Sequence, residues 1–305
     1  MPTLDDLPSL ALFARVVQLR SFSAAARETG IAKSAVSRRI AELERALGVR
    51  LLQRTTRSVV ATDEGLAVYE HSAALLSAAS AAFDAAGATD GLVRGTVRVS
   101  APITFAEMHL APAISAFLGA HPDVSVELAT DDRVVDVVEG GFDVAIRIGR
   151  LSDSELVARR LAEDRLVVCG APSYLAARGV PETPEALVNH ECLHYRLVSR
   201  AAEWRFRGGG GRPLAVPVRG RFEAANGGVL REAAIAGAGL AVLPSFMVAE
   251  DVRAGRLELV LEGARRAKIG IFAVTAHRTG APPRTRAFLD FVARRFARPE
   301  TIPRL

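Results

Sequence analysis

The fold is decided by the stretch from Ser21 to Gly65, SFSAAARETGIAKSAVSRRIAELERALGVRLLQRTTRSVVATDEG. Ser23 can cap a short helix over residues 24–29, and Gly30 then ends that helix by accepting a left-handed conformation. A second helix is predicted from Ala32 to Leu47, because apolar residues recur there at helical spacing. Two helices joined by a short glycine-containing turn are typical of a helix-turn-helix.

The second of these helices has an apolar side and a polar side. The apolar stripe consists of Val36, Ile40, Leu43 and Leu47. Small and basic residues on the other side suit a major groove, because hydroxyls can donate to phosphates or base edges and long cations can reach their acceptors. We therefore expect DNA contacts from Lys33, Ser34, Ser37 and Arg38, together with Ser23 at the preceding helix.

A short hairpin is predicted after the second helix, with strands over residues 51–54 and 58–61. Its tip, Thr55-Thr56-Arg57, is expected to lie along phosphates as a wing. Residues 11–58 carry ten arginines and lysines against three glutamates, a charge of +7, whereas the whole chain carries +5. This concentration of positive charge implies double-stranded DNA as the partner, and the alternative is a small helical bundle with a solvated basic face.

Two further helices are predicted beside the helix-turn-helix. Before it, apolar spacing indicates a helix with Asp6 as its cap and Pro8 in its first turn. After it, Thr62 can cap a helix from Asp63 to Gly87, roughly 37 Å long at 1.5 Å per residue. Its apolar seam alternates spacings of three and four: Leu66, Tyr69, Ala73, Leu76, Ser80 and Phe83. We expect a homodimer through residues 63–87, and the alternative is that the seam packs on its own domain.

The remaining two thirds of the chain predict an α/β domain with two lobes. Residues 89–95 contain two glycines and are expected to form a hinge. Beyond them, predicted strands and helices alternate, which favours a parallel or mixed sheet covered by helices. The expected organisation is a winged helix-turn-helix (residues 1–62), a linker helix (63–88), the hinge (89–95) and an effector-binding domain (96–305) that resembles periplasmic binding proteins. Within this last domain, lobe I is expected at residues 96–163 and 266–305, and lobe II at residues 164–265.

A candidate ligand site lies where the predicted strand over residues 96–100 opens into a helix over residues 103–118. Ligands of open α/β sheets collect at the carboxyl ends of strands, and free N–H groups at a helix start favour an anion such as a carboxylate. Hydroxyls and charges at or near three such strand ends are the expected contacts: Ser100, Thr104, Thr130, Asp131 and Arg147. The alternatives are that Asp143 or Asp136 neutralises Arg147 and that Ser100 only caps its helix.

The stretch from Ser21 to Gly65 resembles the LysR-type transcriptional regulators. The resemblance continues through VRVSAP, GFDVAIRIG and GAGLAVLP, which begin at Val97, Gly141 and Gly237. It implies a homodimer or a dimer of dimers on an interrupted palindrome, responding to a small-molecule effector. The fold class it implies is an N-terminal all-α winged helix-turn-helix with a long linker helix, followed by the two-lobed α/β effector domain.

The resemblance also assigns roles by position in these motifs. Lys33, Ser34, Ser37 and Arg38 correspond to groove-reading residues and Arg54 to a wing contact. The effector residues it implies are the set above with Pro102, Asn226, Gly227 and Pro244 added. One departure is Ala32, which stands where many members of the family have a capping serine or threonine; the missing cap is worth about 1 kcal/mol.

Enzyme motifs are weak in this chain. His190-Glu191-Cys192-Leu193-His194 matches H-E-x-x-H, but residues 192–198 alternate like a strand, which would place the two histidines about 13 Å apart. Cys169 and Cys192 are expected to be packing residues. We therefore expect no catalytic residues, metal or cofactor. The alternative function is a small-molecule-binding protein or metalloenzyme with an incidental helix-turn-helix.

The start of the chain does not resemble a secretory signal, because Asp5 and Asp6 replace the basic region and Arg15 interrupts the apolar residues. No uninterrupted apolar stretch reaches the roughly 18 to 20 residues needed to span a bilayer. The sequence therefore predicts a cytoplasmic protein without a membrane partner.

Overall fold

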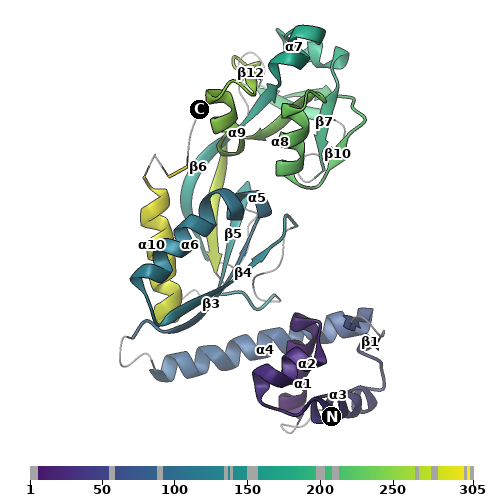
Figure 1. The fold of residues 1–305 in the computed structure, drawn as a ribbon, viewed down its shortest axis with the longest axis vertical. Helices are drawn as coiled ribbons and strands as arrows, with labels where there is room; N and C mark the ends of the chain where they lie inside the picture. Colours follow the sequence, from purple (N-terminus) through teal and green to yellow (C-terminus); the bar gives the residue numbers. More distant parts are fainter. Residues whose placement is uncertain are drawn as a thin grey trace. The chain divides into compact units, whose positions relative to one another are not determined.

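The computed structural model describes residues 6–54, 59–87, 92–133, 137, 140–149, 157–196, 203–207, 213–264, 268–275, 281–298 and 301–302. The chain divides into two compact units (Figure 1). Unit 1 contains residues 1–92 and 136–142, and unit 2 contains residues 93–135 and 143–305. Residues 89–91 of the expected hinge lie outside the described residues. The sequence also predicts a helix over residues 134–139, of which only Val137 is described.

Unit 1 is a winged helix-turn-helix followed by a long helix. Its elements are α1 (Leu7–Leu19), α2 (Phe22–Thr29), α3 (Lys33–Leu47), β1 (Leu52–Arg54), β2 (Val59–Ala61) and α4 (Asp63–Gly87). The predicted stripe of α3 supplies Val36, Ile40 and Leu43 to a core that also buries Phe13 and Leu51. This arrangement confirms the predicted fold of the N-terminal part, and α4 has the bounds that the sequence predicted.

Several predicted ends and faces in unit 1 need correction. Ser21, not Ser23, caps α2, because the Ala24 N–H donates to Ser21 Oγ at 3.2 Å. A capping side chain accepts from an amide two or three residues ahead, so Ser23 lies inside the helix and is exposed. Asp6 stands at the start of α1 without a side-chain capping bond. Leu47 is exposed, because the last turn of α3 extends past the core before Gly48 ends the helix.

The start of α4 packs on its own domain. Thr62 caps it as predicted, since the Gly65 N–H donates to Thr62 Oγ1 at 2.9 Å. Val68 and Tyr69 pack against the core of unit 1, which supports the alternative interpretation for this part of the seam. Leu66 stays 49% exposed. The side chains of Ser80 and Phe83 lie outside the described residues.

Unit 2 is built on one mixed sheet, which has nine strands within the described residues. The order is β10-β7-β11-β6-β13-β5-β3-β4, with β12 beside β6. Strand β3 runs parallel to β4 and β5, whereas β13 runs antiparallel to β5 and β6. The strands are β3 (Gly95–Ala101), β4 (Val124–Thr130), β5 (Val144–Gly149), β6 (Val157–Gly170), β7 (Cys192–Tyr195), β10 (Glu223–Ala224), β11 (Leu240–Pro244), β12 (Glu258–Val260) and β13 (Lys268–Thr275).

Strand β6 passes through both lobes. Its first part pairs with β13 and its last part with β11 and β12. The boundary that we placed between Glu163 and Asp164 therefore falls inside one continuous strand. The sequence predicts a strand only over residues 164–170, because the first half of β6 is exposed and rich in charged residues.

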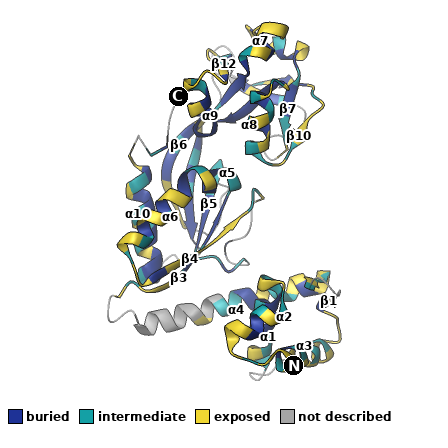
Figure 2. Cartoon of the chain, in the orientation of Figure 1, coloured by how far each residue is buried: buried dark blue, intermediate teal, exposed yellow. Residues whose placement is uncertain are grey.

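Helices cover this sheet. Lobe I carries α10 (Pro283–Phe296) and a helical run composed of α5 (Ile103–Phe105), a π-helical turn (Ala106–Leu110) and α6 (Ala111–Ala120). Lobe II carries α7 (Pro172–Arg178), a 3-10 helix (Pro184–Asn189), α8 (Gly227–Ile235), α9 (Ser245–Arg253) and a separate hairpin of β8 (Glu203–Arg207) and β9 (Pro213–Pro217). Figure 2 shows buried residues concentrated along β5 and β6.

The run Ile103–Ala120 is long and apolar enough to cross a membrane by length and composition alone. In this structure it contributes Phe105, Leu110 and Phe117 to the main core of unit 2. A buried core helix passes the same test of length and composition.

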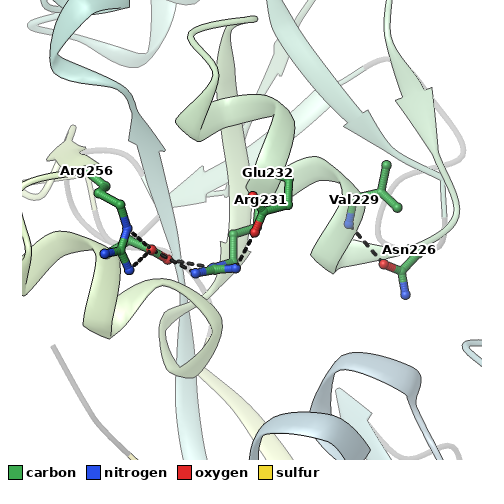
Figure 3. Close-up of polar contacts among 6 residues, drawn as sticks. Asn226, Val229, Arg231, Glu232 and Arg256 are labelled. Atoms are coloured by element: carbon green, nitrogen blue, oxygen red, sulfur yellow. Dashed lines mark hydrogen bonds and ion pairs between the residues drawn. The ribbon is translucent and has the colours of Figure 1, made fainter.

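Helices α8 and α9 are joined by a buried ion-pair network (Figure 3). Asp251 is 0% exposed and accepts from Arg231 Nε at 2.6 Å, Arg231 Nη2 at 2.8 Å and Arg256 Nε at 2.8 Å. Arg231 also pairs with Glu232, which is 68% exposed, at 2.6 Å. The two carboxylates therefore share one guanidinium but differ in burial.

We predict that Asp251→Asn destabilises unit 2 by about 2–4 kcal/mol, because a buried ion pair loses one partner. The control Glu232→Gln should cost less than about 0.5 kcal/mol, because exposed pairs contribute little. Urea unfolding followed by the fluorescence of Trp204, the single tryptophan, measures both variants. Equal effects of the two substitutions would contradict this prediction.

Candidate DNA-contact face and effector site

The N-terminal half of α3 presents a basic, hydroxyl-bearing surface. Lys33, Ser34 and Arg38 are exposed, and Ser37 is half-buried. Arg38 is 75% exposed, and its Nε lies 3.9 Å from Glu42 Oε1, a distance at which an exposed pair contributes little. The Arg38 side chain can therefore leave Glu42 for another acceptor at little cost.

No side chain caps the start of α3, in agreement with the predicted effect of Ala32. The Ala32 carbonyl accepts from Ala35 N at 2.9 Å and from Val36 N at 3.0 Å. Gly30, with a φ of +68°, makes the turn from α2. Its backbone conformation is one that residues with a side chain rarely adopt.

The wing is held to α3 by a residue that the sequence did not indicate. Glu44 Oε1 accepts from Leu51 N at 2.8 Å and from Leu52 N at 3.1 Å. Strands β1 and β2 pair antiparallel, with Arg54 opposite Val59. Glutamates are common on helix surfaces, so nothing in the local pattern distinguishes Glu44. The tip residues Thr55, Thr56 and Arg57 and the side chain of Arg54 lie outside the described residues.

The predicted effector residues of lobe I gather at one edge of the sheet. Ser100 pairs in register with Ala129 and Ala145, and Thr130 ends β4 opposite Ala101. Ser100 is 1% exposed and Thr104 is 5% exposed. No hydrogen bond to either hydroxyl is found within the described part of the chain, and neither oxygen is among the fully enclosed atoms that lack a partner there, which are His109 Nε2, Thr285 Oγ1 and Arg295 Nε. Pro102 lies between them as the residue preceding α5.

The two charged residues predicted for this edge lie differently. Arg133 lies beside Asp131, with Nη2 2.8 Å from Oδ2, and its hydrogen bonds lower the Asp131 pKa. Arg147 lies in β5 opposite Phe272 and is half-buried. Asp143, the neutralising partner considered for Arg147, accepts from the Arg98 backbone N–H at 2.8 Å. Asp136 lies outside the described residues.

Asp132, which the sequence pattern did not indicate, connects the two lobes. Its Oδ1 accepts from Ile103 N at 3.0 Å, at the start of α5, and its Oδ2 accepts from Asn226 Nδ2 at 2.6 Å. Asn226 in turn caps α8, since its Oδ1 accepts from Val229 N at 3.0 Å (Figure 3). The expectation of free N–H groups at the helix start is therefore wrong for Ile103, whose N–H already binds a carboxylate of the chain.

The start of α8 approaches lobe I closely. A Cβ atom on Gly228 would lie 3.1 Å from Thr104 Oγ1, so a larger residue would press against that hydroxyl. Gly227 is buried against Met247 and Tyr195. Burial, with a smaller contribution from the charge of Asp132, raises the Tyr195 pKa to about 12, so the phenol stays neutral at physiological pH.

These contacts bring Thr104, Asp132 and Asn226 together, with Gly227 beside them. Pro244 is buried at the end of β11, opposite Leu166 of β6, and immediately precedes α9. Its neighbour Ser245 bonds Asp164 through its hydroxyl. The described contacts of Pro244 thus belong to the junction between β6 and α9 rather than to the cluster around Asp132.

The H-E-x-x-H match does not lie on a helix. His190 is buried with Nδ1 3.3 Å from the Tyr174 hydroxyl, and β7 begins at Cys192. The described residues contain no group of three or more His, Cys, Asp or Glu side chains able to hold a metal ion. Cys169 and Cys192 are buried, and burial raises the pKa of each thiol to about 12. A thiol with so high a pKa is a poor nucleophile.

Two family models match the chain. Residues 7–66 match the bacterial regulatory helix-turn-helix of the lysR family, and residues 90–297 match the LysR substrate binding domain. Among curated proteins, the chain is 34% identical over 305 residues to the probable HTH-type transcriptional regulator LtrA of Klebsiella pneumoniae, covering 99% of this chain and 96% of that protein. It is also 34% identical to the transcriptional regulator CrgA of Neisseria meningitidis serogroup C, covering 93% and 94%.

Solved structures give the same result. The full-length structure of CrgA from Neisseria meningitidis matches with a TM-score of 0.62 and 30% identity, covering 98% of this chain and 100% of that one. The virulence activator AphB of Vibrio cholerae matches with a TM-score of 0.61 and 30% identity, covering 95% and 98%. The chain therefore belongs to the LysR-type family, as a DNA-binding transcriptional regulator with an effector-binding domain.

Proposed function

We propose that this regulator reads its operator with the N-terminal half of α3 and holds the DNA backbone with its wing. The exposure of Lys33, Ser34 and Arg38 is the observation that carries the proposal. Ser23 and Ser37 would add hydroxyl contacts, while Arg54, Thr55, Thr56 and Arg57 would follow phosphates. A phosphate at the uncapped start of α3 would satisfy helix N–H groups that no side chain binds.

We propose that the effector contacts both lobes. Supporting this are the buried hydroxyls of Ser100 and Thr104 in lobe I and the nearby start of α8 in lobe II. A small carboxylate suits these donors, and Tyr195 would add a neutral phenol. The wider set would be Pro102, Thr130, Asp131, Arg147, Asn226, Gly227 and Pro244. Effector binding would alter the packing of the two lobes and, through it, the spacing of the two DNA-binding domains of a dimer on DNA.

We propose a homodimer through α4, and pairs of dimers on the operator. The exposure of Leu66 supports this dimer interface. Nearly half of Leu66 is exposed, whereas the neighbouring apolar residues of α4 pack against the core of unit 1. The domain organisation would then be residues 1–62 for DNA, 63–88 for dimerisation, 89–95 as hinge and 96–305 for the effector. The chain would work in the cytoplasm. The alternative of a metalloenzyme has no metal cluster to support it among the described residues.

For DNA recognition we predict that Arg38→Ala weakens sequence-selective binding by about 1–3 kcal/mol, roughly 5- to 150-fold, because a base-edge or phosphate contact is lost. Fluorescence anisotropy with DNA from upstream of the protein's own gene, at several salt concentrations, measures the change. The control Arg45→Ala removes the same charge from the last turn of the same helix. An equal loss in both variants would show that only the net charge of α3 counts.

For the effector site we predict that Ser100→Ala and Thr104→Val each weaken binding of an acidic effector by about 10- to 150-fold, because a hydrogen bond to a charged group contributes about 1.5–3 kcal/mol. The effector is first found as a small aromatic or aliphatic carboxylate that raises the Tm of the wild-type chain. Thr285→Val is the control, since Thr285 is a buried hydroxyl on α10. Normal affinity in both site variants would remove these hydroxyls from the site.

For assembly we predict that Leu66→Glu converts the dimer to monomer at micromolar concentration, because it would bury a charge in an apolar interface. Sedimentation velocity measures the state. Val60→Glu, on β2 and 53% exposed, is the matched control and should remain dimeric. A dimer that survives Leu66→Glu would place the interface elsewhere than the first turns of α4.

A further inference from the structure

Asp132 binds one donor from each lobe. Oδ1 accepts from the backbone N–H of Ile103, and Oδ2 accepts from the side-chain amide of Asn226, at 3.0 and 2.6 Å. These donors are 123 residues apart in the chain, yet one carboxylate satisfies both. Asp132 is therefore the point at which a change in hydrogen bonding at the start of α5 would reach the start of α8.

The surroundings of this carboxylate are those of a binding site for an anion. Ile103 begins a continuous helical run of 18 residues, whose N–H groups and dipole favour negative charge at that end. The hydroxyls of Ser100 and Thr104, both more than nine-tenths buried, flank Ile103 in the chain and have no partner among the described residues. The hydroxyls of Ser100 and Thr104 are therefore hydrogen-bond donors near Asp132 that the Asp132 carboxylate does not use.

We infer that the Asp132 carboxylate occupies the anion-binding position of the effector site, and that an acidic effector binds by displacing this carboxylate. The inference rests on the proposed effector site. An effector carboxylate that accepts from Ile103 N and Asn226 Nδ2 excludes Asp132 from both donors. Effector binding and the Asp132–Asn226 bond are then mutually exclusive, so the effector exchanges a bond within the chain for bonds to itself.

The Asp132 carboxylate competes with a carboxylate from solution for the same donors, and this competition limits the affinity of the carboxylate from solution. The apparent dissociation constant rises by the inverse of the fraction of molecules whose site is free. If Asp132 occupies the donors in 90–99% of molecules, removing its carboxylate strengthens binding of a free carboxylate about 10- to 100-fold. The effect should be visible even with acetate, which supplies the carboxylate and little else.

The test uses acetate with the full-length chain, and sodium chloride at equal ionic strength as the reference. The readout is the shift of the Ile103 backbone amide in protein labelled with nitrogen-15 at isoleucine. Asp132→Ala is expected to bind acetate at least tenfold more tightly than wild type. Acetate should also raise the Tm of this variant selectively, which gives a second readout if the substitution destabilises the chain.

Two controls separate displacement from a change of charge. Asp131→Ala removes an identical charge one residue away, from a side chain that pairs with Arg133. Asp132→Asn removes the charge but keeps a side-chain oxygen for the Ile103 N–H. Both are expected to bind acetate as weakly as wild type, to within about threefold.

Acetate binding that is equally weak in Asp132→Ala and wild type overturns the inference, and so does an equal gain in all three variants. Neither result bears on the proposed effector site, because Ser100 and Thr104 can still bind an effector that leaves Asp132 in place. Conversely, a selective gain in Asp132→Ala stands even if the effector titration fails with the Ser100 and Thr104 variants.

Discussion

The pairing of β6 with β13 is the interaction on which the regulatory unit depends. Strand β6 continues from that pairing into lobe II, where it pairs with β11 and β12, so both lobes share one backbone hydrogen-bond ladder. They also share one core, in which the rings of Phe105 and Phe246 meet edge-on with centroids 5.5 Å apart. Lobes joined in this way cannot separate without breaking sheet hydrogen bonds and exposing aromatic surface.

The DNA-binding unit is organised by two constraints of different kinds. Apolar burial of Val36, Ile40 and Leu43 fixes which side of α3 faces inward and therefore which side carries Arg38. The wing is instead positioned by hydrogen bonds from two backbone N–H groups to Glu44. Burial leaves a periodic pattern in the sequence, whereas a single carboxylate bonding two amides does not. The recognition helix could thus be derived from residue spacing alone, and the position of the wing could not.

The same distinction explains which parts of the regulatory unit could be predicted. The bounds of β4 follow from the apolar alternation and flanking turn residues of 124–130, and the structure agrees with them. The first half of β6 was not predicted because residues such as Arg159 and Arg160 are exposed, so the sequence there shows no alternation of apolar and polar residues. This half is a strand because it pairs with β13. Ser23 was preferred to Ser21 as a helix cap because both are serines, and only the backbone path decides which hydroxyl reaches the Ala24 N–H.

At the effector site, the sequence indicated the strand ends and their hydroxyls, and of the two adjacent aspartates it indicated Asp131 and not Asp132. Asp131 and Asp132 are adjacent and identical in type, so no propensity separates them. The structure separates them by their partners: Asp131 bonds Arg133 two residues away, whereas Asp132 bonds Asn226 across the lobes. A partner 94 positions away becomes visible only once the sheet has brought β4 and α8 together. The identity of that partner determines the chemistry of the site, because a carboxylate held by donors of both lobes must be either used or displaced by whatever binds there.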